Sequence, residues 1–218
     1  MSSNHQRDLY ENEWSGVQLA TELGDTGWKT TVPAPDFAKF TAYLRQNHVT
    51  GTALDLGCGG GRYTIALAQC GFQTSGIDFA ESAIHQAIHN AQASLPGKTI
   101  DFRVGNVLEL PYPDASFDVV NDDGCLHHIE PHDWTRYQKN VTRVLKPGGL
   151  MRIKAFSAAS SYRGEDSTVF THFFTRNQLT ELLGEGFNLV DIFENEHPKT
   201  PAKRFWFAVF KKRPHLGT

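Results

Sequence analysis

The chain has 218 residues, of which 39% are hydrophobic and 21% are charged, a composition typical of a soluble globular protein. A formal charge of −3 offers no basic surface for a nucleic acid or an anionic membrane, so we expect neither as a partner. The three cysteines form no C-x-x-C pair, which argues against a zinc knuckle or a disulfide framework, and no apolar stretch approaches the roughly 20 residues that span a bilayer.

The first fifty residues carry weak structural signals. The opening MSSNHQRDLYENEW is polar and lacks the apolar core of a signal peptide, so a cytoplasmic location is expected. A turn-rich stretch over 22–37 leads into a predicted helix over 36–48, where apolar residues recur at helical spacing. These residues are Phe37, Phe40, Tyr43 and Leu44.

From residue 51 onward, predicted strands alternate with predicted helices. The strands are expected at 52–57, 72–79, 99–106, 116–122, 150–156, 187–194 and 204–211. The helices are expected at 62–71, 81–95, 131–146 and 176–185. This order predicts an α/β, Rossmann-like doubly wound fold: a seven-stranded sheet, mostly parallel with an antiparallel C-terminal strand, and helices on both faces.

Three local signals refine the helices. Thr175 and Gln178 have the spacing of a capping box for the helix over 176–185. One face of the helix over 81–95 is expected to carry Ile84, Ala87, Ile88, Ala91 and Leu95. One face of the helix over 131–146 is expected to carry Trp134, Tyr137, Val141, Val144 and Leu145.

The first predicted strand runs into glycines, LDLGCGGGRY. Gly57, Gly59 and Gly61 allow a tight turn and a close approach of the backbone to a ligand. Asp78 ends the second strand about twenty residues later, where such folds place an acid for ribose hydroxyls. A dinucleotide site would want glycine where Arg62 stands, and Asp55 would repel a pyrophosphate but suit a cationic amino group. The pattern favours a cationic nucleoside ligand over a dinucleotide.

Five stretches in order, ALDLGCGGGRYTIALA, GIDFAESAI, FRVGNVLELPYPDASFDVV, LHHI and VLKPGGLMRIKAF, resemble the successive motifs of class I S-adenosylmethionine-dependent methyltransferases, of the small-molecule type in methyltransferase domain families 11 and 25. The resemblance covers residues 51–156 and implies an enzyme with S-adenosylmethionine as cofactor and S-adenosylhomocysteine as product. One domain is expected over 1–218, with a helical cap on the substrate side over 1–50, a cofactor-binding core over 51–156, and a substrate loop, helix and terminal strand pair over 157–218.

The resemblance also implies which residues bind the cofactor. Gly57, Cys58, Gly59 and Gly61 would line its methionyl part, with Asp55 near the ammonium group. Asp78 would bind the ribose diol and Phe79 would pack against the adenine, whose edge would meet Asn106 and Val107. Asn121 and Asp122, at the end of the fourth strand, would touch cofactor or acceptor. The family usually has Asp where this chain has Asn106, and an amide oxygen can accept the same hydrogen bond.

The acceptor is expected to be a small molecule with an oxygen, nitrogen or sulfur nucleophile, methylated by in-line displacement, and the protein to be a monomer or homodimer. NDDG over 121–124 lacks the prolines of enzymes that methylate planar amino groups. The same turn faintly resembles the thiopurine methyltransferase-like branch, so an S-methyltransferase is one alternative. A catalytically silent methyltransferase-like binding protein is another. Candidate acceptor-binding residues are Trp14, Trp28, Tyr162, His172 and Phe173.

The stretch NDDGCLHHIEPHD over 121–133 is dense in potential metal ligands. Glu130, His132 and Asp133 fit the start of the following helix, and the side chains of the adjacent His127 and His128 diverge. No metal site is therefore predicted. One of the two adjacent histidines at most is a candidate general base.

Overall fold

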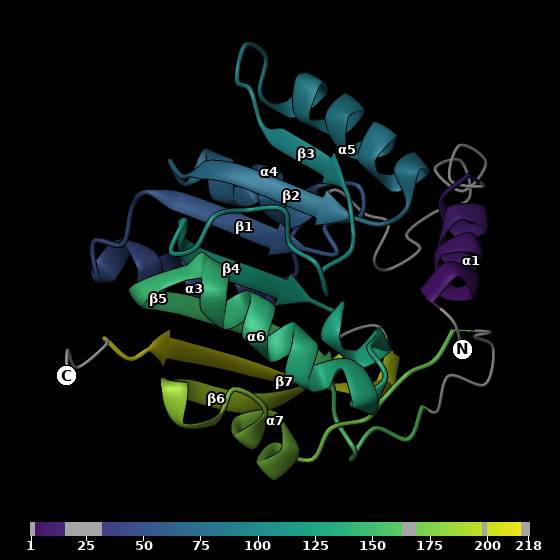
Figure 1. Cartoon of the computed structure of the whole chain (residues 1–218), viewed down its shortest axis with the longest axis vertical. Coiled ribbons are helices and arrows are strands. Elements are labelled where there is room, and N and C mark those ends of the chain that lie inside the picture. The colour runs from purple at the N-terminus through teal and green to yellow at the C-terminus, as the bar shows by residue number, and fades with distance from the viewer. Residues whose placement is uncertain (1–2, 16–31, 163–168, 198–199, 215–218) are drawn as a thin grey trace. The chain divides into compact units, whose positions relative to one another are not determined.

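The computed structural model describes residues 3–15, 32–162, 169–197 and 200–214 (Figure 1). The chain divides into two compact units, Met1–Val107 and Leu108–Thr218. The organisation as a single domain stays a prediction.

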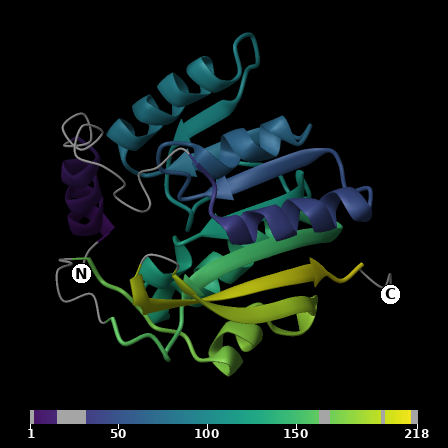
Figure 2. The same ribbon diagram turned by 180° about the vertical axis from the view of Figure 1, so that it is seen from behind.

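The first unit contains three parallel strands and four helices among its described residues. Its strands are β1 (Thr52–Leu56), β2 (Gln73–Asp78) and β3 (Asp101–Val104). Its helices are α1 (Ser3–Ser15), α3 (Pro35–Gln46), α4 (Arg62–Gln69) and α5 (Glu81–Ser94). Strand β1 is buried from Ala53 to Leu56, as is typical of parallel strands covered by helices. In Figure 2, α4 lies in front of the strands of this unit, and it packs on β1 and β2.

Packing in the first unit confirms the predicted helices and corrects one of their faces. The apolar residues of α3 that are buried include Phe37, Phe40 and Leu44, as its periodicity predicts. Helix α5 buries small residues and Ile84 against β2 and β3, but Ile88 is 39% exposed and was wrongly placed on the packed face. The buried stripe advances by three or four residues per turn, through 80, 84, 87 and 91, and leaves position 88 at its edge.

The second unit contains four strands and two α-helices among its described residues. Its strands are β4 (Phe117–Asp123), β5 (Leu145–Phe156), β6 (Phe187–His197) and β7 (Thr200–Lys212). Its helices are α6 (Trp134–Val144) and α7 (Arg176–Leu182), and short 3₁₀ turns cover Leu126–His128, Pro131–Asp133 and Gly184–Gly186. In Figure 1, α6 lies in front of the strands of this unit. Strand β5 begins at Leu145, earlier than predicted, and its pairing with β4 shifts register between Phe117 and Val119.

The strand order is β3-β2-β1-β4-β5-β7-β6. Strand β7 runs antiparallel to β5 and to β6, whereas the β1–β2, β2–β3 and β4–β5 pairs are parallel. The predicted α/β class, with a mostly parallel seven-stranded sheet and an antiparallel C-terminal strand, is confirmed. Among the described helices none has the length and apolar character to cross a bilayer.

The capping box of α7 is present as predicted. The Thr175 hydroxyl accepts a hydrogen bond from the Gln178 N–H (3.2 Å), and the Gln178 side-chain oxygen accepts one from the Thr175 N–H (2.9 Å). Two backbone donors that the helix itself leaves unpaired are therefore satisfied.

Thr175→Ala should lower the free energy of unfolding by about 1 kcal/mol, because it removes this cap. Urea unfolding followed by circular dichroism measures the change. Thr180→Ala in the same helix is the matched control, since the Thr180 hydroxyl bonds only the Asn177 carbonyl and caps no helix end. Equal effects from both substitutions would contradict the capping role.

Candidate functional site

The turn between β1 and α4 depends on three glycines. Gly57, Gly59 and Gly61 have φ of 60°, 51° and 80°, in the left-handed region that side chains with a Cβ rarely adopt. The Cys58 N–H donates to the Ile77 carbonyl of β2 (3.0 Å), which ties the turn to the neighbouring strand. The predicted glycine turn is therefore a fixed backbone cradle at the carboxyl end of β1.

Asp78, at the end of β2, reaches this turn. One carboxylate oxygen accepts the Gly59 N–H (2.9 Å) and the other accepts the Ala80 N–H (3.0 Å). The side chain is almost fully buried, and this burial raises the pKa of Asp78, while the backbone hydrogen bonds oppose the rise. Each carboxylate oxygen has a second lone pair, so both can accept further hydrogen bonds.

The other residues predicted for the cofactor in the first unit lie at the ends of its three strands. Asp55 is buried in β1 and accepts a hydrogen bond from the Thr64 hydroxyl of α4 (2.7 Å). Phe79 is half-buried beside Tyr10, with ring centroids 5.3 Å apart. Asn106 and Val107 follow β3, where the Gly105 N–H donates to the Asp78 carbonyl (2.8 Å). A cradle of left-handed glycines bounded by two carboxylates fits a nucleoside ligand that carries a positive charge.

Trp14 lies against the glycine turn. A Cβ built on Gly59 would come within 2.7 Å of the indole ring, and one built on Gly60 within 3.2 Å. The indole is only 5% exposed and packs on Ala80 and Ala83. Trp14 was predicted for the acceptor, yet one of its neighbours is Gly59, which was predicted for the cofactor. Trp28 falls outside the described residues.

In the second unit, Asn121 and Asp122 turn their side chains into the protein interior. The Asn121 side-chain oxygen accepts a hydrogen bond from the Arg152 guanidinium (2.8 Å). The Asp122 carboxylate accepts from the Tyr137 hydroxyl (2.7 Å) and from the N–H groups of Cys125 (2.9 Å) and Leu126 (3.1 Å). The Asp122 carboxylate thus holds the 3₁₀ turn that carries both histidines, and contact of either residue with the cofactor stays a prediction.

The two adjacent histidines have different ring partners. The Nδ1 of buried His127 accepts the Phe156 N–H (3.4 Å), so the proton of the neutral ring is on Nε2. The Nδ1 of half-buried His128 is 2.8 Å from the Phe170 carbonyl, which requires a proton on Nδ1 and leaves the lone pair on Nε2. Burial lowers the pKa of His127 well below its ordinary value and that of His128 to about 4, so both rings are neutral near pH 7.

Three of the predicted residues lie around Phe156, the last residue of β5. Its ring centroid lies 4.7 Å from that of His127, 5.3 Å from that of Phe173 and 5.7 Å from that of Tyr162. Phe156 was not among the predicted site residues, although its place at the carboxyl end of a predicted strand was a signal for one. His172 lies apart from this group, with its ring against Trp134 (4.8 Å) and Phe174 (4.6 Å).

No three His, Cys, Asp or Glu side chains come together in a metal-binding group within the part of the chain that the structure describes. Instead, His132 lies near Glu130 and Asp133, with a nitrogen–oxygen separation of 3.4 Å in each pair. His132 and Asp133 lie in the 3₁₀ turn at Pro131–Asp133, ahead of α6, and Glu130 directly precedes this turn.

Asp122 gives the second unit a testable pH dependence. Burial raises the pKa of this fully buried carboxyl to about 7, although hydrogen bonds from Tyr137, Leu126 and Cys125 oppose the rise. The pKa of the Asp122 carboxyl is about 4 in the unfolded chain and about 7 in the folded protein. Between these two pH values the folded state holds a proton that the unfolded state has lost, so this contribution to stability falls as pH rises.

Relative to Asp122→Asn, the wild type should lose up to about 1.4 kcal/mol of unfolding free energy per pH unit between pH 4 and 7. Urea unfolding of both proteins across that range measures the difference, which should be constant above pH 8. Asp114→Asn is the control, because Asp114 is an exposed acid of the same unit. A difference between wild type and Asp122→Asn that does not change with pH would contradict the raised pKa.

Part of the chain is similar to known methyltransferases. Residues 53–149 match the model of a methyltransferase domain. The 27-O-demethylrifamycin SV methyltransferase of Amycolatopsis mediterranei is 36% identical over 112 residues, which are 51% of this chain and 40% of that protein. A probable S-adenosylmethionine-dependent methyltransferase of Mycolicibacterium smegmatis is 33% identical over 143 residues, 63% of this chain and 52% of that protein. The chain thus spans about half the length of these curated relatives.

A solved structure supports the same fold. The 1,6-didemethyltoxoflavin-N1-methyltransferase of Burkholderia thailandensis, crystallised with 1,6-didemethyltoxoflavin and S-adenosylhomocysteine, aligns with a TM-score of 0.74 over 98% of this chain and 91% of that one. At 22% sequence identity, this likeness shows the fold alone.

Proposed function

We propose that the chain is a class I S-adenosylmethionine-dependent methyltransferase and that it transfers the methyl group of S-adenosylmethionine to a small-molecule acceptor. The match of residues 53–149 to a methyltransferase domain and the similarity to two named methyltransferases support this proposal. The observation that carries this proposal is the Asp78 carboxylate, held by the Gly59 N–H at the carboxyl ends of β1 and β2. A small acceptor is supported by two similar proteins, which are named for methylating a demethylrifamycin and a didemethyltoxoflavin.

We assign the cofactor to the first unit. The Asp78 carboxylate accepts a hydrogen bond from the ribose hydroxyls, and buried Asp55 offsets the charge of the ammonium group. The backbone of the glycine turn contacts the methionyl part at Gly57, Cys58, Gly59 and Gly61. Phe79 packs on the adenine, whose edge meets Asn106 and Val107. Asn121 and Asp122 are proposed, as in the sequence prediction, to touch the cofactor or the acceptor.

We assign the acceptor to the second unit, around Phe156. Rings of Tyr162, Phe173 and His127 surround Phe156 and offer an apolar, aromatic environment. Such an environment excludes water, which would compete as a nucleophile and screen the developing charges. S-adenosylmethionine supplies a methyl group on a sulfonium. A lone pair of the acceptor forms the new bond to the methyl carbon as the carbon–sulfur bond breaks.

An acceptor that arrives with a proton must release it, and the ring geometry favours His128 as the group that takes it. The Nδ1–H of His128 donates to the Phe170 carbonyl, so the basic nitrogen of its neutral ring is Nε2. His127 has the opposite tautomer and can only donate from Nε2. With a pKa near 4, His128 is a weak base, but a hydroxyl oxygen that gains a methyl group while it keeps its proton is a far stronger acid than imidazolium.

Asp78→Asn should weaken S-adenosylmethionine binding by about 10- to 100-fold, because a charged hydrogen-bond acceptor contributes roughly 1.5–3 kcal/mol. Isothermal titration calorimetry measures the dissociation constant. Asp101→Asn is the matched control, since that acid is 43% exposed at the start of β3 and pairs with Arg103. Thermal melting separates lost binding from lost folding.

Failure of the wild type to bind S-adenosylmethionine in the micromolar range would overturn the proposed function. If the wild type binds and a folded Asp78→Asn binds equally well, only the ribose assignment is wrong.

His128→Gln should lower turnover by about 100- to 10,000-fold on an acceptor that carries a proton, with unchanged cofactor affinity, because it removes the proton acceptor. His127→Gln should slow turnover less. The assay follows S-adenosylhomocysteine release with an acceptor that the wild type methylates. A larger loss from His127→Gln than from His128→Gln would reverse the assignment.

A further inference from the structure

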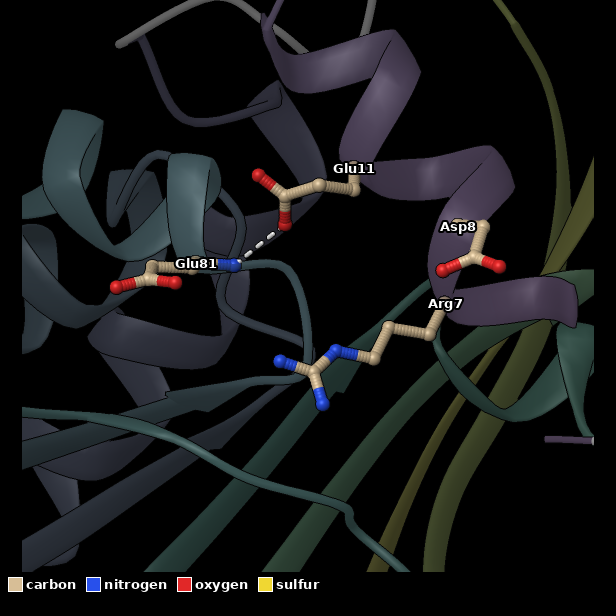
Figure 3. A pocket seen from close by; sticks show the side chains of 4 residues that line it. All are labelled: Arg7, Asp8, Glu11 and Glu81. Atoms are coloured by element: carbon tan, nitrogen blue, oxygen red, sulfur yellow. Dashed lines mark hydrogen bonds between the residues drawn. The ribbon is translucent and has the colours of Figure 1, made fainter. Parts of the chain in front are cut away.

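Helix α1 is anchored to the start of α5 by one side chain. The Glu11 carboxylate accepts hydrogen bonds from the N–H groups of Glu81 (2.7 Å) and Ser82 (3.0 Å), and Figure 3 shows the first of these. The N-cap residue of α5 is Ala80, which has no side-chain acceptor to offer those donors. Glu11, about 70 residues away in the chain, supplies the cap instead.

The anchor sets where the aromatic side chains of α1 lie. Tyr10 meets Phe79 edge to face, and Trp14 covers Gly59 and Gly60 and packs on Ala80 and Ala83. The anchor residue Glu11 also lines a polar pocket together with Arg7, Asp8 and Glu81 (Figure 3). The apolar contacts of α1 therefore point to the glycine turn and to the residues that follow Asp78.

We propose that the indole of Trp14 forms a wall of the cofactor site beside the sulfonium, and that it distinguishes S-adenosylmethionine from S-adenosylhomocysteine by charge. This inference rests on the proposed function, which assigns Gly59 to the methionyl part of the cofactor. Trp14 then belongs to the cofactor side of the reaction and not, as its sequence position suggested, to the acceptor.

The chemistry of the sulfonium favours an aromatic neighbour. An indole face attracts a cation through its quadrupole and is the strongest of the natural side chains in this respect. It also presents no localised lone pair that could take the methyl group in place of the acceptor. The two carboxylates of the site, Asp55 and Asp78, are assigned to the ammonium and the ribose, so the sulfonium charge is left to the ring.

The contact with the Trp14 indole would also favour replacement of bound S-adenosylhomocysteine by S-adenosylmethionine after each reaction. Methyl transfer converts the sulfonium into a neutral thioether, and the attraction to the indole is lost at that moment. S-adenosylhomocysteine would then keep its ribose and adenine contacts but lose the contribution that depends on charge. The ratio of the two dissociation constants therefore reports on Trp14 specifically.

The test is calorimetric titration of the full chain with S-adenosylmethionine and with S-adenosylhomocysteine. Trp14→Leu should weaken S-adenosylmethionine binding by about 2- to 30-fold more than S-adenosylhomocysteine binding, the range expected for loss of a cation–π contact. Trp14→Phe keeps a weaker aromatic face and should show a smaller change of the same sign. Thermal melting checks that each variant folds, and Trp14→Phe carries the test if Trp14→Leu does not fold.

Tyr10→Leu is the matched control, because it removes the other aromatic ring of α1 next to a residue assigned to the adenine. Both ligands share the adenine, so Tyr10→Leu should weaken them equally. If folded Trp14 variants also weaken both ligands equally, Trp14 is a packing residue and the inference is overturned. If the wild type binds neither ligand, the proposed function itself fails.

Discussion

The carboxylate of Asp78 joins two segments on which the cofactor side of this protein depends. One oxygen fixes Gly59 in the glycine turn, and the other fixes Ala80 just before α5. Burying a carboxylate costs solvation free energy, and the raised pKa of Asp78 reflects that cost. Two backbone donors offset part of it, and a ligand with hydroxyl groups would offset more. In the protein without ligand, the Asp78 carboxylate can therefore accept hydrogen bonds beyond those that the backbone donates.

The second unit uses buried polar groups differently. Asp122 has three donors from its own unit, and Arg152 binds both Asn121 and Asp123. Polar groups with a full set of internal partners rigidify the backbone around them. Here they hold the end of β4 and the 3₁₀ turn at Leu126–His128, so the two histidine rings are presented in fixed and different tautomers. In the first unit, the Asp78 carboxylate can still accept hydrogen bonds from a ligand. In the second unit, the buried polar side chains accept hydrogen bonds from groups of the same unit and fix their positions.

Most of the fold could be predicted because its signals are local. Strand–helix alternation, the glycine turn and the box at Thr175 each depend on residues within a few positions of one another. Helix α1 was predicted only as part of a helical cap over 1–50 and without bounds of its own. Its sequence is polar, and its apolar side chains, Tyr10 and Trp14, find their partners about 45 to 70 residues away. The roles of the histidines could not be separated either, since their tautomers depend on Phe156 and Phe170, which follow 29 and 42 residues later.

Trp14 also limits which glycines of the turn can be substituted in evolution. Gly59 is constrained twice, by its positive φ and by the indole, so replacing Trp14 would not release it. Gly60 has no positive φ, and only its contacts with Trp14 and Asn90 exclude a Cβ. Relatives with small residues at both position 14 and position 90 would therefore have room for a side chain at position 60 but not at 59. The turn would diverge first at the one glycine whose identity is set by a neighbour and not by its own backbone.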